Sequence, residues 1–206
     1  MNDAGNDKGK FIMIRSIRPW YGMLGRAVLI VEVCLIAGLL ETALGQQPLL
    51  SPRDSVELKY NGNKKIAVNY GRPSMRGRII MGGLVPYNKW WRTGANEATS
   101  FVTEVDIVLG GEEIPKGSYT LYTMPSEKQW KLIINRQTGQ WGTVYNPDLD
   151  LKRILLKKKT LKTPVEKFTI TLEKNGNGGG IMKLVWENTE LSIAFKIRKN
   201  SKSSTH

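Results

Sequence analysis

The residues best suited to chemistry in this chain lie between Leu58 and Asn96, and they are cations, aromatics and amides. The stretch has no Asp or Glu but has eight Lys or Arg side chains. Its guanidinium groups can match carboxylate, sulfate or phosphate with paired hydrogen bonds; they belong to Arg72, Arg76, Arg78 and Arg92. We therefore predict an anion-binding face. The alternative is that these arginines pair with carboxylates of distant strands, such as Glu104, Asp106, Glu187 or Glu190.

Two adjacent tryptophans, Trp90 and Trp91, follow Tyr87 in the same stretch. Adjacent residues of a strand point to opposite faces, so one indole can fill the core while the other lies at the surface. An exposed indole beside a tyrosine would offer a stacking platform for a sugar ring or another flat group. Alternatively, both indoles are core or loop-anchoring residues, because large aromatic side chains are mostly buried. Trp141, which precedes Gly142, permits the same two interpretations.

Asn96 and Glu97 add an amide and the only carboxylate of residues 70–99. Glu97 could act as a general base if burial raised its pKa. Neighbouring arginines would lower that pKa instead, which favours an ion-pair partner over a base. The predicted ligand-binding residues are therefore Arg72, Arg76, Arg78, Tyr87, Trp91, Arg92, Asn96 and Glu97, and Glu97 is the one catalytic candidate.

Histidine and cysteine are nearly missing from the chain. The sole cysteine, Cys34, lies in an N-terminal apolar run, and the sole histidine, His206, is the last residue. This excludes thiolate nucleophiles, His-assisted serine triads and His/Cys zinc sites from the body of the chain. Residues 146–150 place oxygen ligands on alternate positions but lack the central glycine and the distant glutamate of a calcium loop. We predict no metal and no cofactor.

The N-terminus has the pattern of a secretory signal peptide. Arginines precede an apolar run at 27–40, and Ala43 and Gly45 then supply small residues before Gln46. The run is shorter than the roughly 20 apolar residues that cross a bilayer. We expect residues 1–45 to be a signal peptide, or else a retained N-terminal anchor. The protein is then exported, to the periplasm or the outer envelope.

The net charge of +13 bears on the partner. For an exported protein it favours an anionic polysaccharide or another anionic envelope component over nucleic acid. Solubility alone would also explain the charge. We expect contact with a membrane only through an uncleaved N-terminal segment, and the sequence predicts no particular oligomeric state.

Hydrophobic alternation with a period of two places these side chains on strands. It recurs in the segments 66–70, 130–134, 168–172, 182–186 and 191–197, and each describes a strand with one buried face. A further strand is expected from about 98 to 109. Gly110-Gly111, Pro115 to Gly117 and Asn175 to Gly180 supply turns. These patterns predict an all-β fold.

The predicted domain is a single antiparallel β-sandwich, jelly-roll-like or barrel-like, and it occupies residues 56–198. A short lead-in at 46–55 precedes it. A disordered polar tail at 199–206 follows it.

Several longer motifs resemble those of a known family. They are Ser51-Pro52, Tyr70 to Pro73, Arg76 to Arg78, Gly82 to Tyr87, Trp91 to Thr99, Ile114 to Leu121, Trp130 to Asn135 and Gln140 to Gly142. Over about residues 51–197 the chain resembles the bacterial family called domain of unknown function 2911. The resemblance implies an exported bacterial β-rich domain without an established activity, and it carries over no catalytic residue.

Our leading hypothesis is an exported, non-catalytic β-sandwich that binds an anionic or carbohydrate ligand of the bacterial envelope through the 70–99 surface. One alternative is a hydrolase or lyase that uses Glu97 with arginine and tyrosine support. The other is a structural or partner-binding envelope protein. A pocket where Glu97, Arg72 and Trp91 converge would favour binding or catalysis, whereas a buried, mutually paired set would favour the structural alternative.

Overall fold

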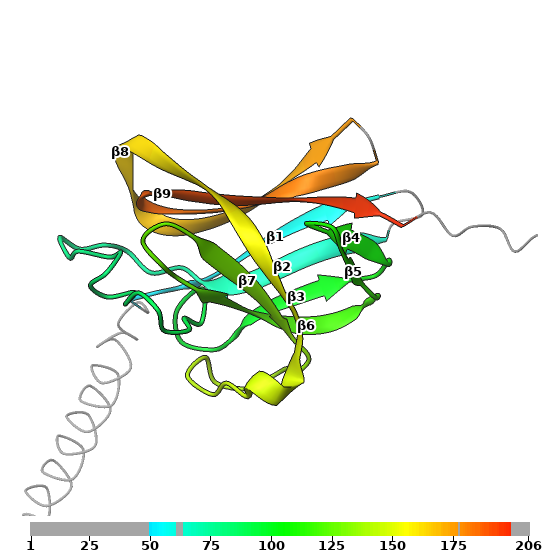
Figure 1. Cartoon of the computed structure of the whole chain (residues 1–206), viewed down its shortest axis with the longest axis horizontal. Coiled ribbons are helices and arrows are strands. Elements are labelled where there is room, and N and C mark those ends of the chain that lie inside the picture. Colours follow the sequence, from blue (N-terminus) through cyan, green and yellow to red (C-terminus); the bar gives the residue numbers. More distant parts are fainter. Residues whose placement is uncertain (1–49, 61–63, 177, 199–206) are drawn as a thin grey trace, which may run out of the picture. The chain divides into compact units, whose positions relative to one another are not determined.

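The computed structural model describes residues 50–60, 64–176 and 178–198 (Figure 1). The expected signal peptide or anchor at 1–45 and the expected tail at 199–206 lie outside these residues. The described strands are β1 (Arg53–Lys59), β2 (Lys65–Gly71), β3 (Thr99–Thr103), β4 (Ile107–Leu109), β5 (Glu112–Ile114), β6 (Gly117–Met124), β7 (Trp130–Asn135), β8 (Asp150–Asn175) and β9 (Gly179–Ile197). Within the described part, the one helical element is the 3-10 turn η2 (Pro147–Leu149). The all-β prediction is confirmed.

All strand pairs are antiparallel, and their order is β1-β2-β3-β6-β7-β8-β9-β4-β5. Strand β8 is 26 residues long and belongs to both layers of the fold. Its first part, to Leu156, pairs with β7, and the part from Lys157 onward pairs with β9. The β8–β9 hairpin therefore folds over the layer formed by β1, β2, β3, β6 and β7 (Figure 1).

The core lies between these layers, and the predicted alternation is confirmed in β2, β8 and β9. It is not confirmed in β7, where Ile133 and Asn135 of the expected exposed face are also buried. Side chains that alternate along β2, including Ile66, Val68 and Tyr70, are buried. They belong to one hydrophobic cluster with Phe168 and Trp186 of the β8–β9 hairpin. Burial of apolar surface at about 25 cal/mol per Å² is the main stabilising contribution in such a core.

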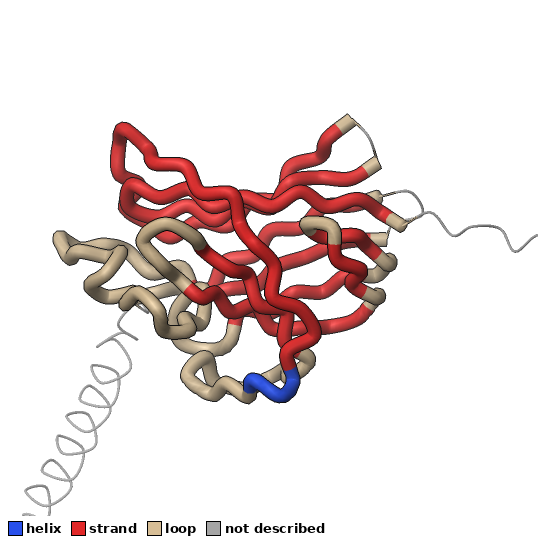
Figure 2. The backbone as a smooth tube through the Cα atoms, viewed as in Figure 1, coloured by secondary structure: helices blue, strands red, loops and turns tan. Residues whose placement is uncertain are grey.

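The loop that follows β2 closes one side of the two-layer fold. Phe168 donates its N–H to the carbonyl of Pro73 at 2.9 Å, and Met75 donates to Glu166 at 2.8 Å. The Tyr70 hydroxyl accepts the N–H of Ile170 at 3.0 Å. Loops gather at the end of the sheet where this closure occurs (Figure 2), and the long 72–98 connection begins there.

The prediction of one strand from about 98 to 109 is wrong. The chain forms two strands there, β3 and β4, because it crosses between the layers at residues 104–106. Strand β3 pairs with β2 and β6, whereas β4 pairs with β5 and β9. The Thr103 hydroxyl donates to the carbonyl of Val105 at 2.5 Å, and Asp106 accepts the N–H of Lys116 at 2.8 Å. These side chains satisfy backbone groups that a continuous ladder would have used, so the chain can turn.

Across the described residues, no helix has the length and hydropathy needed to span a bilayer. The same residues contain no group of three or more His, Cys, Asp or Glu side chains that could hold a metal ion.

Candidate functional site

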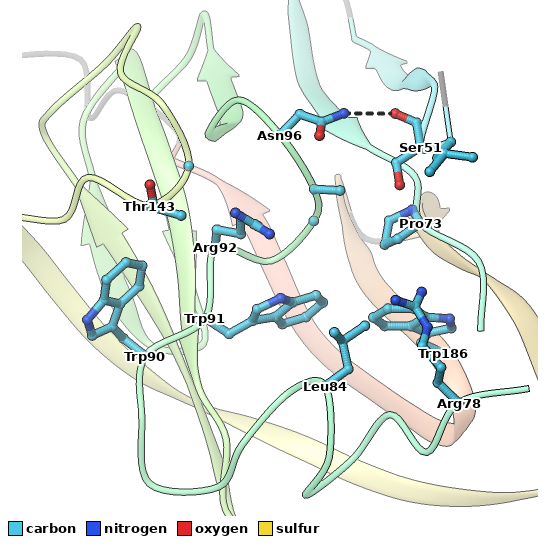
Figure 3. A pocket seen from close by; sticks show the side chains of 14 residues that line it. Ser51, Pro73, Arg78, Leu84, Trp90, Trp91, Arg92, Asn96, Thr143 and Trp186 are labelled. Atoms are coloured by element: carbon cyan, nitrogen blue, oxygen red, sulfur yellow. Dashed lines mark hydrogen bonds between the residues drawn. The ribbon is translucent and has the colours of Figure 1, made fainter. Parts of the chain in front are cut away.

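A pocket of about 420 Å³ lies at the loop end of the sheet (Figure 3). Its wall comes from the 72–98 loop, the 136–149 loop, the start of the described chain and β9. The lining residues are Leu50, Ser51, Pro73, Arg78, Leu84, Trp90, Trp91, Arg92, Gly94, Ala95, Asn96, Gly142, Thr143 and Trp186. The volume lies within the range of about 300–1,000 Å³ that is usual for small-molecule sites.

Two indoles form the apolar floor of the pocket. Trp91 and Trp186 lie nearly parallel, with ring centroids 5.9 Å apart and planes 21° apart. Phe168 meets the edge of Trp91 at 5.1 Å, and Trp186 donates its indole N–H to the carbonyl of Glu166 at 3.1 Å. Trp186 is only 1% exposed, so its position is fixed by the core.

Trp90 packs on a different set of aromatic side chains from the Trp91–Trp186 pair. Its ring meets Tyr122 edge-on at 5.6 Å and Tyr145 at 5.0 Å. Both tryptophans are partly buried, so the expected division into one core and one surface indole is too simple. Each indole packs on its own aromatic cluster and also borders the pocket.

Arg92 supplies a positive charge that no described residue neutralises. Its guanidinium makes no ion pair and no hydrogen bond within the described chain, and it projects over the pocket (Figure 3). Arg78 is held differently, because its guanidinium donates to the carbonyls of Met75 at 3.0 Å and Ser74 at 2.8 Å. No carboxylate lines the pocket, so the wall is electropositive and the Arg92 guanidinium is open to an anion.

The loop segment that carries Trp91 and Arg92 has a strained backbone. Thr93 has φ of 54° and is 0% exposed, an unusual conformation for a β-branched residue. Asn96 also has a positive φ, of 62°. Such strain costs about 1–3 kcal/mol per residue and persists only where the surroundings impose it.

The surroundings of Thr93 do impose this conformation. The Thr99 hydroxyl donates to the carbonyl of Thr93 at 2.8 Å, and Trp91 exchanges two backbone hydrogen bonds with Thr123, at 2.8 and 2.9 Å. Gly142 donates its N–H to the carbonyl of Asn96 at 3.0 Å. The Trp91–Asn96 loop is therefore preorganised, with Arg92 directed into the pocket.

Gly142 explains how closely the two loops approach. A Cβ at this position would lie 2.4 Å from the carbonyl oxygen of Asn96 and 2.7 Å from Cδ of Arg92. Both distances are shorter than real Cβ contacts. The 136–149 loop can therefore support the Arg92 side chain only with glycine at this position.

Glu187 anchors the part of the 72–98 loop that carries Arg78 and Leu84. Its carboxylate accepts the N–H of Ile80 at 3.0 Å and the N–H of Met81 at 3.2 Å. Its own φ is 50°, at an irregularity in the β8–β9 pairing.

Glu187 therefore binds backbone amides and does not pair with an arginine, although it was one of the partners considered for the arginines. The other proposed partners do not pair with these arginines either. Glu104 accepts the N–H of Lys65 at 2.9 Å, and Asp106 accepts the N–H of Lys116.

The arginine that does find a carboxylate is Arg72. It pairs with Asp54 at 3.3 Å and also donates to the carbonyl of Phe168 at 3.2 Å and the hydroxyl of Thr169 at 3.0 Å. These contacts tie the end of β2 to β8. Arg72 therefore lies outside the pocket as a cross-strand tie.

Four of the predicted ligand-binding residues line one pocket, namely Arg78, Trp91, Arg92 and Asn96. The other four are not among its lining residues; they are Arg72, Arg76, Tyr87 and Glu97. The Arg76 guanidinium donates to the carbonyl of Leu50 at 2.6 Å. Tyr87 faces Gly82, where a Cβ would lie 2.9 Å from its ring.

Glu97 lies in a separate depression of about 260 Å³. Its carboxylate is exposed and pairs with Arg53 at 3.5 Å. Glu97 and Trp141 form an isolated antiparallel bridge. Glu97, Arg72 and Trp91 therefore do not converge on one cavity.

Several lining residues were not predicted from sequence. Trp186 was assigned to a strand, and nothing local indicated that it would meet Trp91. Gly142 and Thr143 reach the pocket because the 136–149 loop folds back on the Trp91–Asn96 loop. The pair Trp141-Gly142 was the one sequence feature that could have drawn attention to that loop.

Asp150 holds the 136–149 loop in place. Its carboxylate accepts from Asn135 at 2.8 Å, from the Tyr145 hydroxyl at 2.7 Å and from Arg153 at 2.7 Å. Burial and then the hydrogen bond to Asp150 raise the pKa of Tyr145 to about 12. The oxygen-rich 146–150 segment is thus a capped turn, in which Asn146 accepts the N–H of Asp148 at 3.0 Å.

Comparison with known proteins adds one match. Residues 51–195 match the model of the family described as "Protein of unknown function (DUF2911)". No curated protein and no solved structure matches the chain.

Proposed function

Since the chain belongs to the DUF2911 family of proteins of unknown function, its activity has to be argued from the site, and we propose an exported, non-catalytic binding domain. In this proposal the 70–99 surface takes up an anionic or carbohydrate ligand of the bacterial envelope. The ligand occupies the pocket above Trp91 and Trp186.

The observation that carries this proposal is the unpaired guanidinium of Arg92 beside an indole floor. An arginine that only stabilised the fold would have a carboxylate or carbonyl partner, as Arg72 and Arg78 do. Arg92 has none within the described chain, although the loop that bears it is strained and fixed. A guanidinium held in position without a partner favours the binding of an anion, because little ordering entropy is lost on contact.

The indole floor supports a ligand with a flat or apolar part. Trp91 is partly exposed in the pocket, and the buried Trp186 backs it with a nearly parallel ring (Figure 3). Sugar rings and other flat groups stack on such surfaces, and aromatic contacts contribute about 0.5–1.5 kcal/mol beyond the area they bury.

Binding is favoured over catalysis by the position of Glu97. Its carboxylate is exposed, pairs with Arg53 and lines a different depression from Arg92. A general base must lie within hydrogen-bond reach of the proton it removes. A ligand above Trp91 would not meet that condition.

Export is supported by the sequence of residues 1–45. Arginines, an apolar run at 27–40 and small residues before Gln46 form the secretory pattern. A basic exported protein would meet anionic polymers and lipids in the bacterial envelope.

Isothermal titration calorimetry tests the proposal with three probes: an oligomer of a uronic acid, a neutral oligosaccharide of equal length, and inorganic phosphate. We expect at least one probe to bind, and we expect Arg92→Gln to weaken any anionic probe by at least tenfold. The matched control is Arg136→Gln, an exposed arginine outside the pocket. Failure of every probe to bind, or equal binding by the Arg92→Gln variant, would contradict the proposal.

A further inference from the structure

The rim of the pocket is unusually apolar for an exposed surface. Seven large hydrophobic side chains in the described chain are exposed; two of them, Leu50 and Leu84, line the pocket, and three more are next to a lining residue in the sequence. The five are Leu50, Ile79, Leu84, Trp141 and Val144, and the most exposed is Ile79 at 74%. Single exposed hydrophobics need no explanation, but a group around a concavity indicates an interaction site.

These rim residues come from three separate segments that the fold brings together. Leu50 and Leu84 line the pocket directly, and Ile79 follows the lining residue Arg78. Trp141 and Val144 stand on either side of the lining residues Gly142 and Thr143. The exposed apolar residues in and beside the lining therefore come from three separate segments and not from a single exposed strand.

The polar groups in the lining are few, and some are already occupied. The Asn96 amide donates to the carbonyl of Ser51 at 3.2 Å, and Arg78 is bound to two carbonyls. A sugar acid would bring many hydroxyls that need hydrogen-bond partners, and an apolar rim cannot supply them. A hydrocarbon chain would instead gain from burial on the rim.

From the joint placement of the unpaired Arg92 and the apolar rim, we propose that the pocket binds an anionic amphiphile. Its acidic group, a phosphate or a carboxylate, pairs with the Arg92 guanidinium. Its hydrocarbon chain lies against Trp91 and Leu84 and leaves the pocket over Ile79. This inference rests on the proposed function and names the ligand class of the same site.

The key comparison uses dodecyl phosphate below its micelle concentration, with inorganic phosphate as the head group alone. Dodecyl maltoside, also below its micelle concentration, supplies the same tail without a charge. By calorimetry we expect dodecyl phosphate to bind at least tenfold more tightly than either control. Equal binding of dodecyl phosphate and inorganic phosphate would overturn the inference.

Variants separate the rim from the pocket. The double substitution Ile79→Ser with Leu84→Ser should weaken dodecyl phosphate by at least tenfold and leave phosphate binding unchanged. Leu155→Ser is the matched control, because Leu155 is 53% exposed on β8 and does not line the pocket. Arg92→Gln should weaken both probes. If Leu155→Ser and the rim variant behave alike, the rim has no specific role.

Vesicles distinguish a lipid head group from a free amphiphile. The full chain and its rim variant are sedimented with phosphatidylglycerol vesicles and with phosphatidylcholine vesicles. The apolar segment 27–40 is common to both proteins, so a difference between them reports on the rim. If the full chain sediments with the anionic vesicles alone and the rim variant does so less, the ligand is a membrane lipid. If dodecyl phosphate binds but the vesicles show no such difference, the ligand is a free amphiphile.

The inference and the proposed function can fail separately. If the uronic acid oligomer binds through Arg92 and dodecyl phosphate does not, the amphiphile is wrong and the anion-binding function stands. If no probe binds, both are wrong.

Discussion

Removal of the Glu187 carboxylate should release the loop that forms one side of the pocket. The carboxylate accepts the N–H groups of Ile80 and Met81, at 3.0 and 3.2 Å. A hydrogen bond to a charged group contributes about 1.5–3 kcal/mol. The lower bound for two such bonds predicts that Glu187→Ala lowers the free energy of unfolding by about 3 kcal/mol. For a domain of this size that corresponds to a fall in Tm of about 6–12 °C.

Two further substitutions at Glu187 test the reasoning in parts. Glu187→Gln retains one acceptor oxygen but turns an NH₂ group toward the second N–H, so we expect a loss of about 1.5–2 kcal/mol. Glu187→Gly removes both acceptors but relieves the positive φ of 50°, which costs an L-residue about 1–2 kcal/mol. The glycine variant should therefore be about 1 kcal/mol more stable than the alanine variant.

Urea unfolding followed by tryptophan fluorescence measures these differences, with Glu190→Ala on the same strand as the control. If the substitution opens only the loop and not the whole domain, native-state hydrogen exchange of the Ile80 amide detects the opening. A loss of 3 kcal/mol then appears as an acceleration of about a hundredfold at that amide. The reasoning is refuted if Glu187→Ala changes neither the unfolding free energy by more than about 0.5 kcal/mol nor exchange at Ile80.

Three other outcomes are expected. Gly142→Ala should cost about 1–3 kcal/mol by overpacking in urea unfolding, because its Cβ would lie 2.4 Å from a carbonyl oxygen of the facing loop; Gly176→Ala, which meets open space, should cost far less. Arg72→Ala should lower the unfolding free energy by about 1.5–3 kcal/mol yet leave calorimetric anion binding intact, and a loss of binding would show that Arg72 belongs to the site. The pKa of Tyr145 is raised to about 12, so its contribution to stability should be complete below about pH 10 and vanish as the pH rises through 12; ultraviolet titration should find a lower midpoint in Asp150→Asn.

The strands could be predicted because the information for them is local. Alternation in 66–70 and 168–172 reflects one buried face, and the structure buries those faces. The split at Glu104–Asp106 could not be predicted, because it depends on which layer each half joins. Ile107 looks like a continuation of β3 in sequence, but its partner is Ile197 near the end of β9.

The candidate site was predicted only in part, for a related reason. Residue type identified Arg92 and Trp91, since charge and aromatic surface are properties of single side chains. It failed for Arg72, whose partner Asp54 comes from another strand, and it assigned the wrong role to Glu187. Carboxylates can satisfy backbone amides as well as guanidinium groups, and the sequence does not record which of these lies nearby.

The long strand β8 determines when the pocket can exist at all. Trp91 is synthesised well before Trp186, and β8 must pass through both layers before β9 brings Trp186 beneath it. Contacts between such distant segments form late, because a long loop must close first. We expect partly folded chains to expose Trp91 and to lack ligand affinity, so that binding to this pocket reports on completion of folding.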